Sequence, residues 1–245
     1  MRKIKWKQIL LLAGAAAMLG GCGGKDTVKS VKTSGVLRVA VYEEADADDQ
    51  VVKAGDRLLD SLSEALGVEI ETAEAGTAEE AAALVESGEA DIAVGSLTEE
   101  AASGRACDTS SSYAQESVLI VTRRGDYSDC TAAFEGRVLG AQPILAGEAE
   151  TLTADQKDVS VDTSLGADEA ASKLAQGSLD GYICLRGQAE KLIDEKGDIL
   201  QAQSLIAAEP KEYCALVPAK DRKFRQGVNQ MIQSMGDSTQ DQTEE

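Results

Sequence analysis

The residue with the clearest chemistry in the sequence is Cys22, which ends the run Leu19-Gly-Gly-Cys22. A basic head within the first seven residues and an apolar stretch from Ile9 to Leu19 precede it. An apolar stretch of about a dozen residues is too short for a stable membrane span, and small residues before a cysteine suit a signal peptidase. We therefore predict a lipoprotein signal peptide over residues 1–21 and a diacylglyceryl group on the Cys22 thiol. The alternative is an ordinary secretory signal in which Cys22 is incidental.

The rest of the sequence is poor in catalytic side chains. It contains no histidine, which excludes imidazole bases, His-containing triads and the usual zinc sites, and we expect neither a metal nor a cofactor. Glu43 and Glu44 form a carboxylate pair that could carry out acid–base catalysis. Adjacent residues on an acidic loop are more typical of a solvated surface, so an enzyme is the least favoured class.

Four further cysteines follow the anchor without C-x-x-C spacing: Cys107, Cys130, Cys184 and Cys214. In an exported chain they allow three disulfide pairings, and the sequence does not select among these. Independent buried thiols are the other interpretation.

The composition indicates an acidic exported protein. Removal of the signal peptide takes four basic residues away and changes the formal net charge from −19 to −23. Nucleic acid and anionic lipid are therefore poor partners, whereas a cationic ligand is compatible with such a surface. The chain from Cys22 onward is long enough for one large or two small α/β units, and we expect a monomer.

The pattern along the chain predicts a flexible tether over residues 22–34 and ordered structure from Gly35. A doubly wound β-α-β-α-β unit follows, with ligands expected at the carboxyl ends of its strands. Its strands are expected at 36–42, 68–72 and 91–94, and its helices at 50–66 and 77–86.

The same order repeats in a second unit after a Val- and Ile-rich strand at 117–122. Further strands are expected at 137–141, near 159, at 181–185 and at 213–217. Helices are expected near 148 and at 168–176, 188–195 and 221–235. The tail, residues 236–245, is polar and expected to fray.

Several segments, taken in order, resemble the bacterial extracellular solute-binding proteins of the polar amino-acid family, which serve ABC importers. Gly35-Val-Leu-Arg-Val-Ala-Val resembles the opening strand of the family. The run from Leu84 to Thr98 resembles its helix, Gly-x-x-Asp and strand. Further matching segments begin at Asp108, Phe134, Leu174 and Val228.

The resemblance implies an α/β, two-lobed periplasmic-binding-protein-like fold of type II, with two crossing strands that join the lobes. Lobe one is expected at residues 35–119 plus 213–245, and lobe two at 124–208, with crossings near Thr122 and Tyr213. Such lobes close on a small solute, and the closed form is recognised by an ABC permease.

The resemblance also carries over candidate ligand-binding residues. The family's carboxylate-binding arginine falls at Ala101, so Arg105, one helical turn later, either supplies the guanidinium or faces solvent. The ammonium-binding aspartate is replaced by Leu185 beside Arg186, and Gln142 begins a loop that has lost its Gly-Thr pair.

Three hydroxyl-bearing residues complete the candidate set. Tyr42 lines the cleft or belongs to the core, and Ser96 and Thr98 contact a ligand or cap the next helix, with capping preferred for Thr98.

Three functions remain. The first is a lipid-anchored solute receptor of an importer, with an amino-acid-like or anionic ligand. The second is a surface scaffold whose cleft has degenerated, and the third is a dehydratase-like enzyme on the same fold. Transport binding is the preferred interpretation because the fold and the anchor both suit it.

Overall fold

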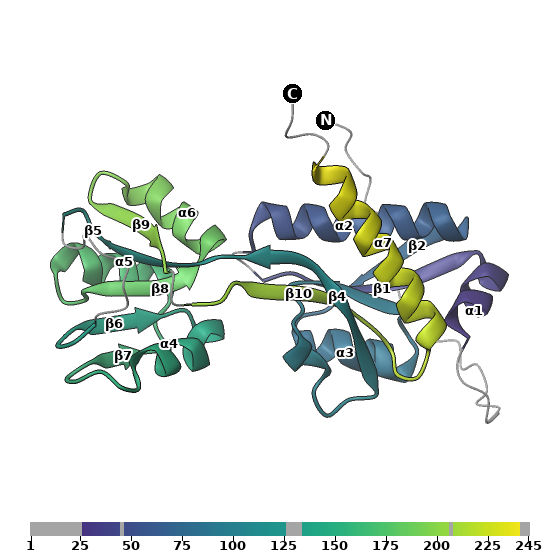
Figure 1. Ribbon diagram of the computed structural model, residues 1–245, viewed down its shortest axis with the longest axis horizontal. Helices are drawn as coiled ribbons and strands as arrows, with labels where there is room; N and C mark the ends of the chain where they lie inside the picture. The colour runs from purple at the N-terminus through teal and green to yellow at the C-terminus, as the bar shows by residue number, and fades with distance from the viewer. Residues whose placement is uncertain (1–25, 45–46, 126–133, 206–207, 241–245) are drawn as a thin grey trace.

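The computed structural model describes residues 26–44, 47–125, 134–205 and 208–240. The signal peptide, Cys22, Cys130 and the last five residues lie outside this range. The described chain forms two α/β lobes, each built on its own five-stranded sheet (Figure 1).

The sheet of lobe one has the order β2-β1-β3-β10-β4. Strands β1, β2 and β3 are parallel, whereas β10 is antiparallel to both of its neighbours. The strands are β1 (Val36–Tyr42), β2 (Glu69–Glu74), β3 (Ile92–Gly95), β4 (Cys107–Glu116) and β10 (Lys211–Pro218). The helices are α1 (Thr27–Ser34), α2 (Asp49–Leu66), α3 (Ala78–Ser87), the 3-10 turn η1 (Glu99–Ala102) and α7 (Arg222–Gln240).

Local signals explain the helix boundaries in lobe one. The carboxylate of Asp48 accepts the Gln50 N–H (2.7 Å) at the start of α2, and Thr77 Oγ1 accepts the Glu80 N–H (3.1 Å) at the start of α3. The Glu80 carboxylate reaches back to the Gly76 N–H (2.7 Å), one residue before the position expected for a capping box. Glycines in the left-handed conformation end both helices.

The sheet of lobe two has the order β7-β6-β8-β5-β9. Its strands are β5 (Val118–Arg123), β6 (Val138–Ala141), β7 (Ser160–Asp162), β8 (Gly181–Leu185) and β9 (Leu200–Ser204). Its helices are the 3-10 turn η2 (Pro143–Leu145), α4 (Ala146–Thr153), α5 (Ala167–Gln176) and α6 (Arg186–Lys196). Strand β8 covers the same residues that the sequence pattern predicts.

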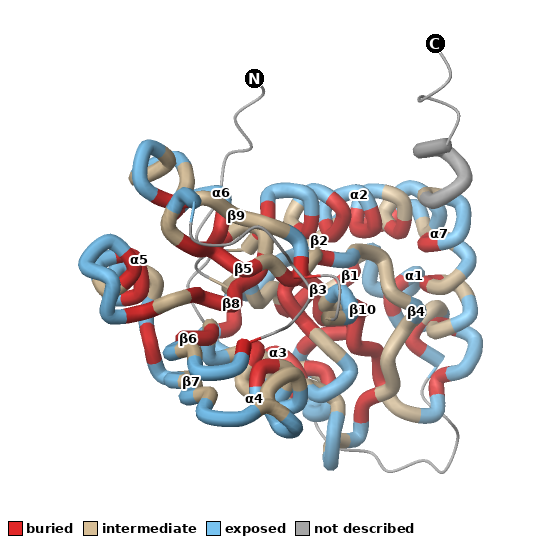
Figure 2. Tube along the Cα trace, turned by 60° about the vertical axis from the view of Figure 1, so that its left-hand side comes forward, coloured by how far each residue is buried: buried red, intermediate tan, exposed pale blue. Residues whose placement is uncertain are grey.

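Each sheet is covered by helices on both faces, which gives each lobe two apolar cores (Figure 2). In lobe one, α1, α2 and α7 cover one face and α3 the other. In lobe two, α5 and α6 cover one face, and α4 with Phe134 covers the other. The buried runs of β3 and β8 fit strands that are enclosed on both sides.

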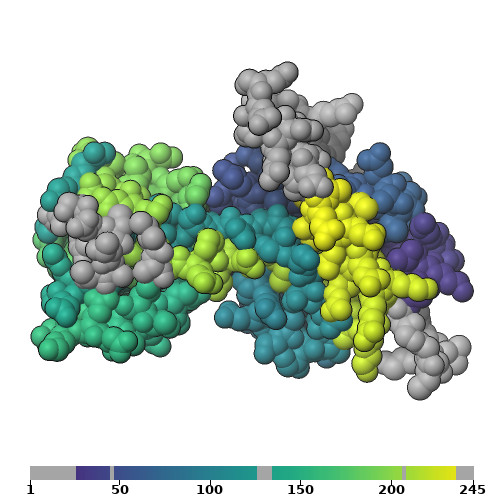
Figure 3. Space-filling model, in the orientation of Figure 1, coloured from purple at the N-terminus to yellow at the C-terminus, as the bar shows by residue number. Residues whose placement is uncertain are grey.

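The chain crosses between the lobes twice, and the molecule narrows where it does so (Figure 3). The first crossing is the short step from β4 to β5 at Ser117, and the second lies between β9 and β10. The expected crossing at Thr122 is wrong, because Thr122 pairs with Gln201 inside the sheet of lobe two. Tyr213 lies two residues after the start of β10, close to the expected second crossing.

The predicted tether is wrong for residues 27–34, which form helix α1 packed on lobe one. Asp26 caps this helix, and Gly35 ends it in the left-handed conformation. Thr27 and Val31 are buried, and the Thr27 N–H donates to the Asp221 carboxylate (2.7 Å). Two inward residues one helical turn apart give this short helix a core-facing side, so residues 27–34 are folded onto lobe one instead of forming a flexible tether.

Within the described ranges, no helix is both long and apolar enough to cross a bilayer.

Candidate functional site

In each sheet, the strand registers place one set of strand ends next to the other lobe. Strand β4 ends at Glu116, opposite Lys211, which begins β10. In lobe two, Val118 at the start of β5 pairs with Leu185 at the end of β8. The carboxyl ends of β1 and β3 therefore face the carboxyl ends of β6 and β8 across the crossings. We call these two facing ends the interlobe edge, and they form the place where such sheets bind ligands.

Tyr42 and Ser96 lie together on the lobe-one side of the interlobe edge. The Ser96 N–H donates to the Tyr42 carbonyl (2.7 Å), and the buried Ser96 hydroxyl accepts the Glu44 N–H (3.2 Å). Gly95 permits this close approach, since its φ is +113° and a Cβ there would lie 1.9 Å from the Tyr42 carbonyl oxygen. Ser96 thus holds the acidic loop against the end of β3.

Carboxylates dominate the electrostatics of this side. Burial, and then Asp56 and Glu74, raise the pKa of Glu43 above its ordinary value. Burial, and then Glu44 and Glu79, raise the pKa of Tyr42. Negative charge at this edge therefore opposes the ionisation of further acidic groups.

Gln142 and Arg186 lie on the lobe-two side of the interlobe edge. The Gln142 side-chain carbonyl accepts the Leu185 N–H (3.0 Å), which joins the ends of β6 and β8. The Arg186 guanidinium donates to the Ser117 hydroxyl (3.0 Å) at the first crossing. Both predicted residues thus reach the expected edge, and both bind neighbouring protein groups there.

A buried carboxylate, Glu116, joins the two crossings. It is 1% exposed. It accepts the Gly187 N–H of α6 (2.8 Å) and the Tyr213 hydroxyl of β10 (2.9 Å). Burial raises the pKa of Glu116, while these two bonds and the nearby Arg186 oppose that rise. A protein carboxylate therefore occupies the N-terminus of α6, a place that favours anions.

A pocket of about 620 Å³ opens beside the second crossing. Its lining is rich in hydroxyls and carboxylates: Thr98, Glu99, Glu100, Ser103, Thr109, Ser110, Ser112, Glu209, Pro210, Lys211, Glu212 and Cys214. The Lys211 ammonium reaches the Glu148 carboxylate of α4 (3.1 Å), so an ion pair joins this pocket to lobe two. The volume suits a small solute.

Thr98 contributes to this pocket rather than acting as a side-chain cap. Its backbone has the extended conformation of an N-cap before η1, but its hydroxyl makes no capping bond. The preferred interpretation of Thr98 as a capping residue is therefore wrong for its side chain.

Arg105 does not join the other candidates. Its guanidinium lies 3.4 Å from the Glu86 carboxylate near the C-terminal end of α3. Because α3 runs antiparallel to its flanking strands, this end of the helix lies away from the interlobe edge. Strand β4 begins two residues later at the same far end, which places Arg105 outside the facing edges.

The described cysteines are buried thiols at Cys107, Cys184 and Cys214. Burial, and then Glu99 and Glu212, raise the pKa of Cys214 to about 12. In the described part of the chain, no cluster of three or more acidic or cysteine side chains is arranged to hold a metal ion.

Sequence reasoning missed Glu116, Lys211 and Glu148. Each becomes important only through a contact with a residue more than 60 positions away, and no local pattern signals such a contact. The sequence does indicate that Tyr213 lies near the second crossing, because it begins the strand predicted at residues 213–217.

Two sheets joined by two crossings, with facing carboxyl ends, define a two-lobed α/β protein. Solved structures agree with this class and with the predicted type II fold. An ancestral cationic amino acid solute-binding protein is 14% identical, with a TM-score of 0.62 over 88% of this chain and 96% of that chain. The Bordetella pertussis BvgS VFT2 domain is 20% identical, with a TM-score of 0.61 over 85% and 91%.

A third similar structure is the amino acid ABC transporter substrate-binding protein AbpA from Streptococcus pneumoniae, bound to L-arginine. It is 20% identical, with a TM-score of 0.56 over 86% of this chain and 93% of that chain. No curated protein matches the sequence. The model of the bacterial extracellular solute-binding proteins, family 3, matches residues 48–245, and the chain belongs to this family.

Proposed function

We propose that the protein is a lipid-anchored solute-binding protein of an ABC importer that binds a small polar solute between its lobes without converting it. The family and the similar structures are binding proteins, which supports binding over turnover. The Leu-Gly-Gly-Cys22 run supports the anchor, and the family supports the permease partner.

We further propose that the solute carries an amine or a guanidinium group. The observation that carries this assignment is the charge of the pocket beside the second crossing. Its lining contains four glutamates and one lysine, and that lysine already pairs with Glu148. An excess of carboxylates attracts a cation and repels an anion. Two of the similar structures are described as cationic amino acid or arginine binders, which supports the same class.

The anionic ligand expected from the arginines has less support. Arg105 pairs with Glu86 away from the interlobe edge. Arg186 lies beside Glu116, whose carboxylate already occupies the N-terminus of α6. An anionic solute would meet that carboxylate.

A ligand screen by thermal shift tests the proposal. The soluble chain from residue 23 is heated with L-arginine, L-lysine, spermidine, L-glutamine, L-glutamate or succinate. A ligand at a hundredfold over its Kd stabilises the native state by about 2.7 kcal/mol, so we expect a shift of several degrees with a cationic compound. Stabilisation by glutamate or succinate alone would reject the cationic class.

A matched pair of variants then locates the site. Glu99→Gln removes one pocket carboxylate, and we expect binding to weaken by about 10-fold or more, since hydrogen bonds to charged groups contribute about 1.5 to 3 kcal/mol. Glu135→Gln removes the same charge before β6, at the end of lobe two that lies away from lobe one. Equal weakening by both variants would indicate a general effect of net charge instead of a contact.

A second candidate function is a surface interaction protein whose interlobe edge no longer binds a solute. The observation that favours it is the internal use of the predicted ligand groups, since Ser96, Gln142 and Arg186 all bond to neighbouring protein atoms. Absence of a shift with every compound, together with a cooperative thermal transition, would support this candidate.

A further inference from the structure

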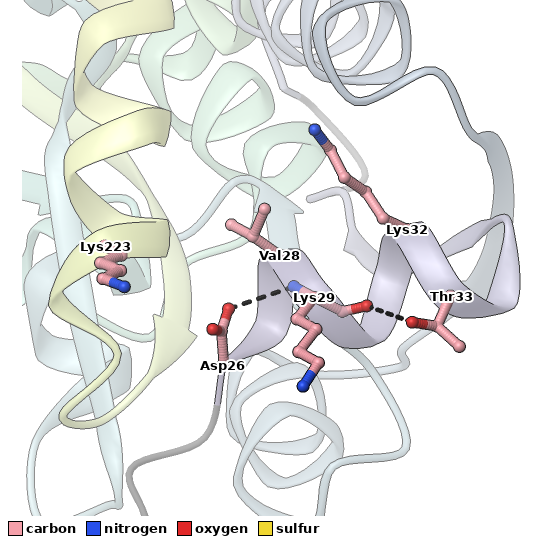
Figure 4. Close-up of a pocket in the computed structure, with 6 residues that line it drawn as sticks. All are labelled: Asp26, Val28, Lys29, Lys32, Thr33 and Lys223. Carbon is pink, nitrogen blue, oxygen red and sulfur yellow. Dashed lines mark hydrogen bonds between the residues drawn. The ribbon is translucent and has the colours of Figure 1, made fainter.

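A group of basic side chains gathers where α1 meets the start of α7. Lys29 and Lys32 of α1 and Lys223 of α7 line a pocket between the two helices (Figure 4). Lys220 and Arg222 flank the same turn and are exposed. The buried Asp221 carboxylate accepts the Thr27 N–H and so holds this turn against α1. We call Lys29, Lys32, Lys220, Arg222 and Lys223 the basic face.

The basic face contrasts with the acidity of the whole chain. Asp26 and Asp221 lie within the same two segments, and their carboxylates accept backbone N–H groups instead of pairing with the lysines. Asp26 accepts the Lys29 N–H, and Asp221 accepts the N–H groups of Thr27 and Phe224. Glu69 borders the face beside Gly35. The ammonium groups of Lys29, Lys32 and Lys223 form no ion pair with any described residue. The face is therefore a local positive surface on an acidic protein.

The basic face lies at the end of the molecule that is remote from lobe two. Figure 1 shows α1 at one end of the long axis and the sheet of lobe two at the other. The topology also places the basic face far from lobe two. Strand β10 begins at the crossings and ends at Pro218, on the far side of lobe one, and α7 follows that far end. Helix α1 precedes β1, which begins at the same far side.

The start of α1 limits how far this face can move from an anchor at Cys22. The four residues from Cys22 to Asp26 span at most about 14 Å in any conformation, since an extended residue covers about 3.5 Å. The tether predicted for residues 22–34 would have allowed about three times this distance. A lipid on Cys22 therefore keeps the N-terminal end of α1 within about two Debye lengths of the membrane surface.

We propose that the basic face docks on anionic lipid headgroups of the membrane that holds the anchor, so that lobe two and the interlobe edge point away from the bilayer. This inference rests on the proposed lipidation of Cys22. It concerns one surface of the protein, whereas the net charge makes the rest of the molecule a poor partner for anionic lipid. Each cation close to such a surface strengthens binding by about fivefold.

Lysine footprinting on vesicles tests the docking without the natural lipid. A hexahistidine tag replaces residues 1–22, and because the chain has no histidine, it alone holds the protein on nickel-chelating lipid. The vesicles contain phosphatidylcholine with or without about a third of phosphatidylglycerol. Acylation of each lysine by an N-hydroxysuccinimide ester is then measured by mass spectrometry.

We expect Lys29, Lys32 and Lys223 to react about fivefold more slowly on the anionic vesicles, and Lys157 and Lys196 of lobe two to react equally on both. Salt at about 1 M, which shortens the Debye length to about 3 Å, should remove the protection. Equal labelling of the three lysines on both vesicles would overturn the proposal and leave the face to a protein partner.

Charge reversal gives a second test. Lys29→Glu with Lys223→Glu should abolish the protection of Lys32, whereas Lys157→Glu with Lys196→Glu, which changes the net charge equally, should preserve it. Protection of Lys32 in both variants would also overturn the proposal. Mass analysis of the N-terminal peptide of the exported full-length protein reports the lipid on Cys22 separately, so failure of the anchor and failure of the docking are distinguished.

Discussion

The hydrogen bond that Tyr213 donates to Glu116 should contribute more to the free energy of unfolding than most single contacts between the crossings. Tyr213→Phe removes the hydroxyl that donates to the Glu116 carboxylate (2.9 Å), and both residues are 1% exposed. Hydrogen bonds to a charged group contribute about 1.5 to 3 kcal/mol, so we expect that loss in the free energy of unfolding near pH 7. The Glu116 carboxylate then retains the Gly187 N–H alone.

The pH dependence of this loss follows from the raised pKa of Glu116. A carboxyl group whose pKa is higher in the folded state binds its proton more tightly there. Its contribution to the stability of the fold is therefore complete below the unfolded-state pKa. That contribution is lost as pH rises through the folded-state pKa. Glu116→Gln should remove this decline, because an amide does not titrate. The wild type should therefore lose stability relative to Glu116→Gln as pH rises from about 4 through the folded-state pKa.

Urea unfolding of the wild type, both single variants and the double variant measures the coupling. A neutral hydrogen bond contributes about 0.5 to 1.5 kcal/mol, so Tyr213→Phe should cost about 1 kcal/mol less in the Glu116→Gln background. Equal costs in the two backgrounds at neutral pH, or a stability difference between wild type and Glu116→Gln that does not change with pH, would refute the reasoning that Tyr213 donates to a buried carboxyl group whose pKa is raised.

Three further changes probe other features. Val31→Ala should lower the free energy of unfolding by about 1.5 to 3 kcal/mol, measured in urea, since Val31 is 1% exposed in the lobe-one core; no loss would restore the tether interpretation. Lys211→Met removes the ion pair with Glu148, which should raise the radius of gyration in X-ray scattering and lower the free energy of unfolding by about 1 kcal/mol or less. Glu148→Gln should have the same two effects. An unchanged radius in both variants would show that the pair does not hold the two lobes together. Cys214, with a pKa of about 12, should resist iodoacetamide in the native protein at about pH 8 and react in urea, as read by peptide mass; native labelling would contradict its burial.

The strands and helices with strong periodicity could be predicted from the sequence. Helix α2 follows from its apolar stripe and its capping residues, and strand β8 follows from its continuous apolar run. Helix α1 could have been found from Asp26, the pair Val28 and Val31, and Gly35, but so short a helix is stable only through its packing on α2, α7 and β1.

Strand β4 shows why other elements could not be predicted. Its residues are mostly polar and half-exposed, because it is an edge strand that pairs with β10 alone among the described strands. Without β4, the sequence does not reveal that Arg105 lies at the far end of the sheet. Gln142 was placed at the correct edge, but its bond to Leu185 depends on how β6 and β8 are aligned.

The position of β10 has a consequence for the order in which the two lobes fold. In the lobe-one sheet, β10 lies between β3 and β4, although the whole of lobe two, from β5 to β9, separates it from them in sequence. A chain that emerges N-terminus first can therefore complete lobe two, an uninterrupted segment, while β4 still waits for its partner. Lobe one closes only after residues 211–240, which form β10 and α7, have been synthesised. The same event sets both crossings, so the interlobe edge forms only when β10 joins the sheet of lobe one, and folding lobe by lobe in chain order cannot complete it.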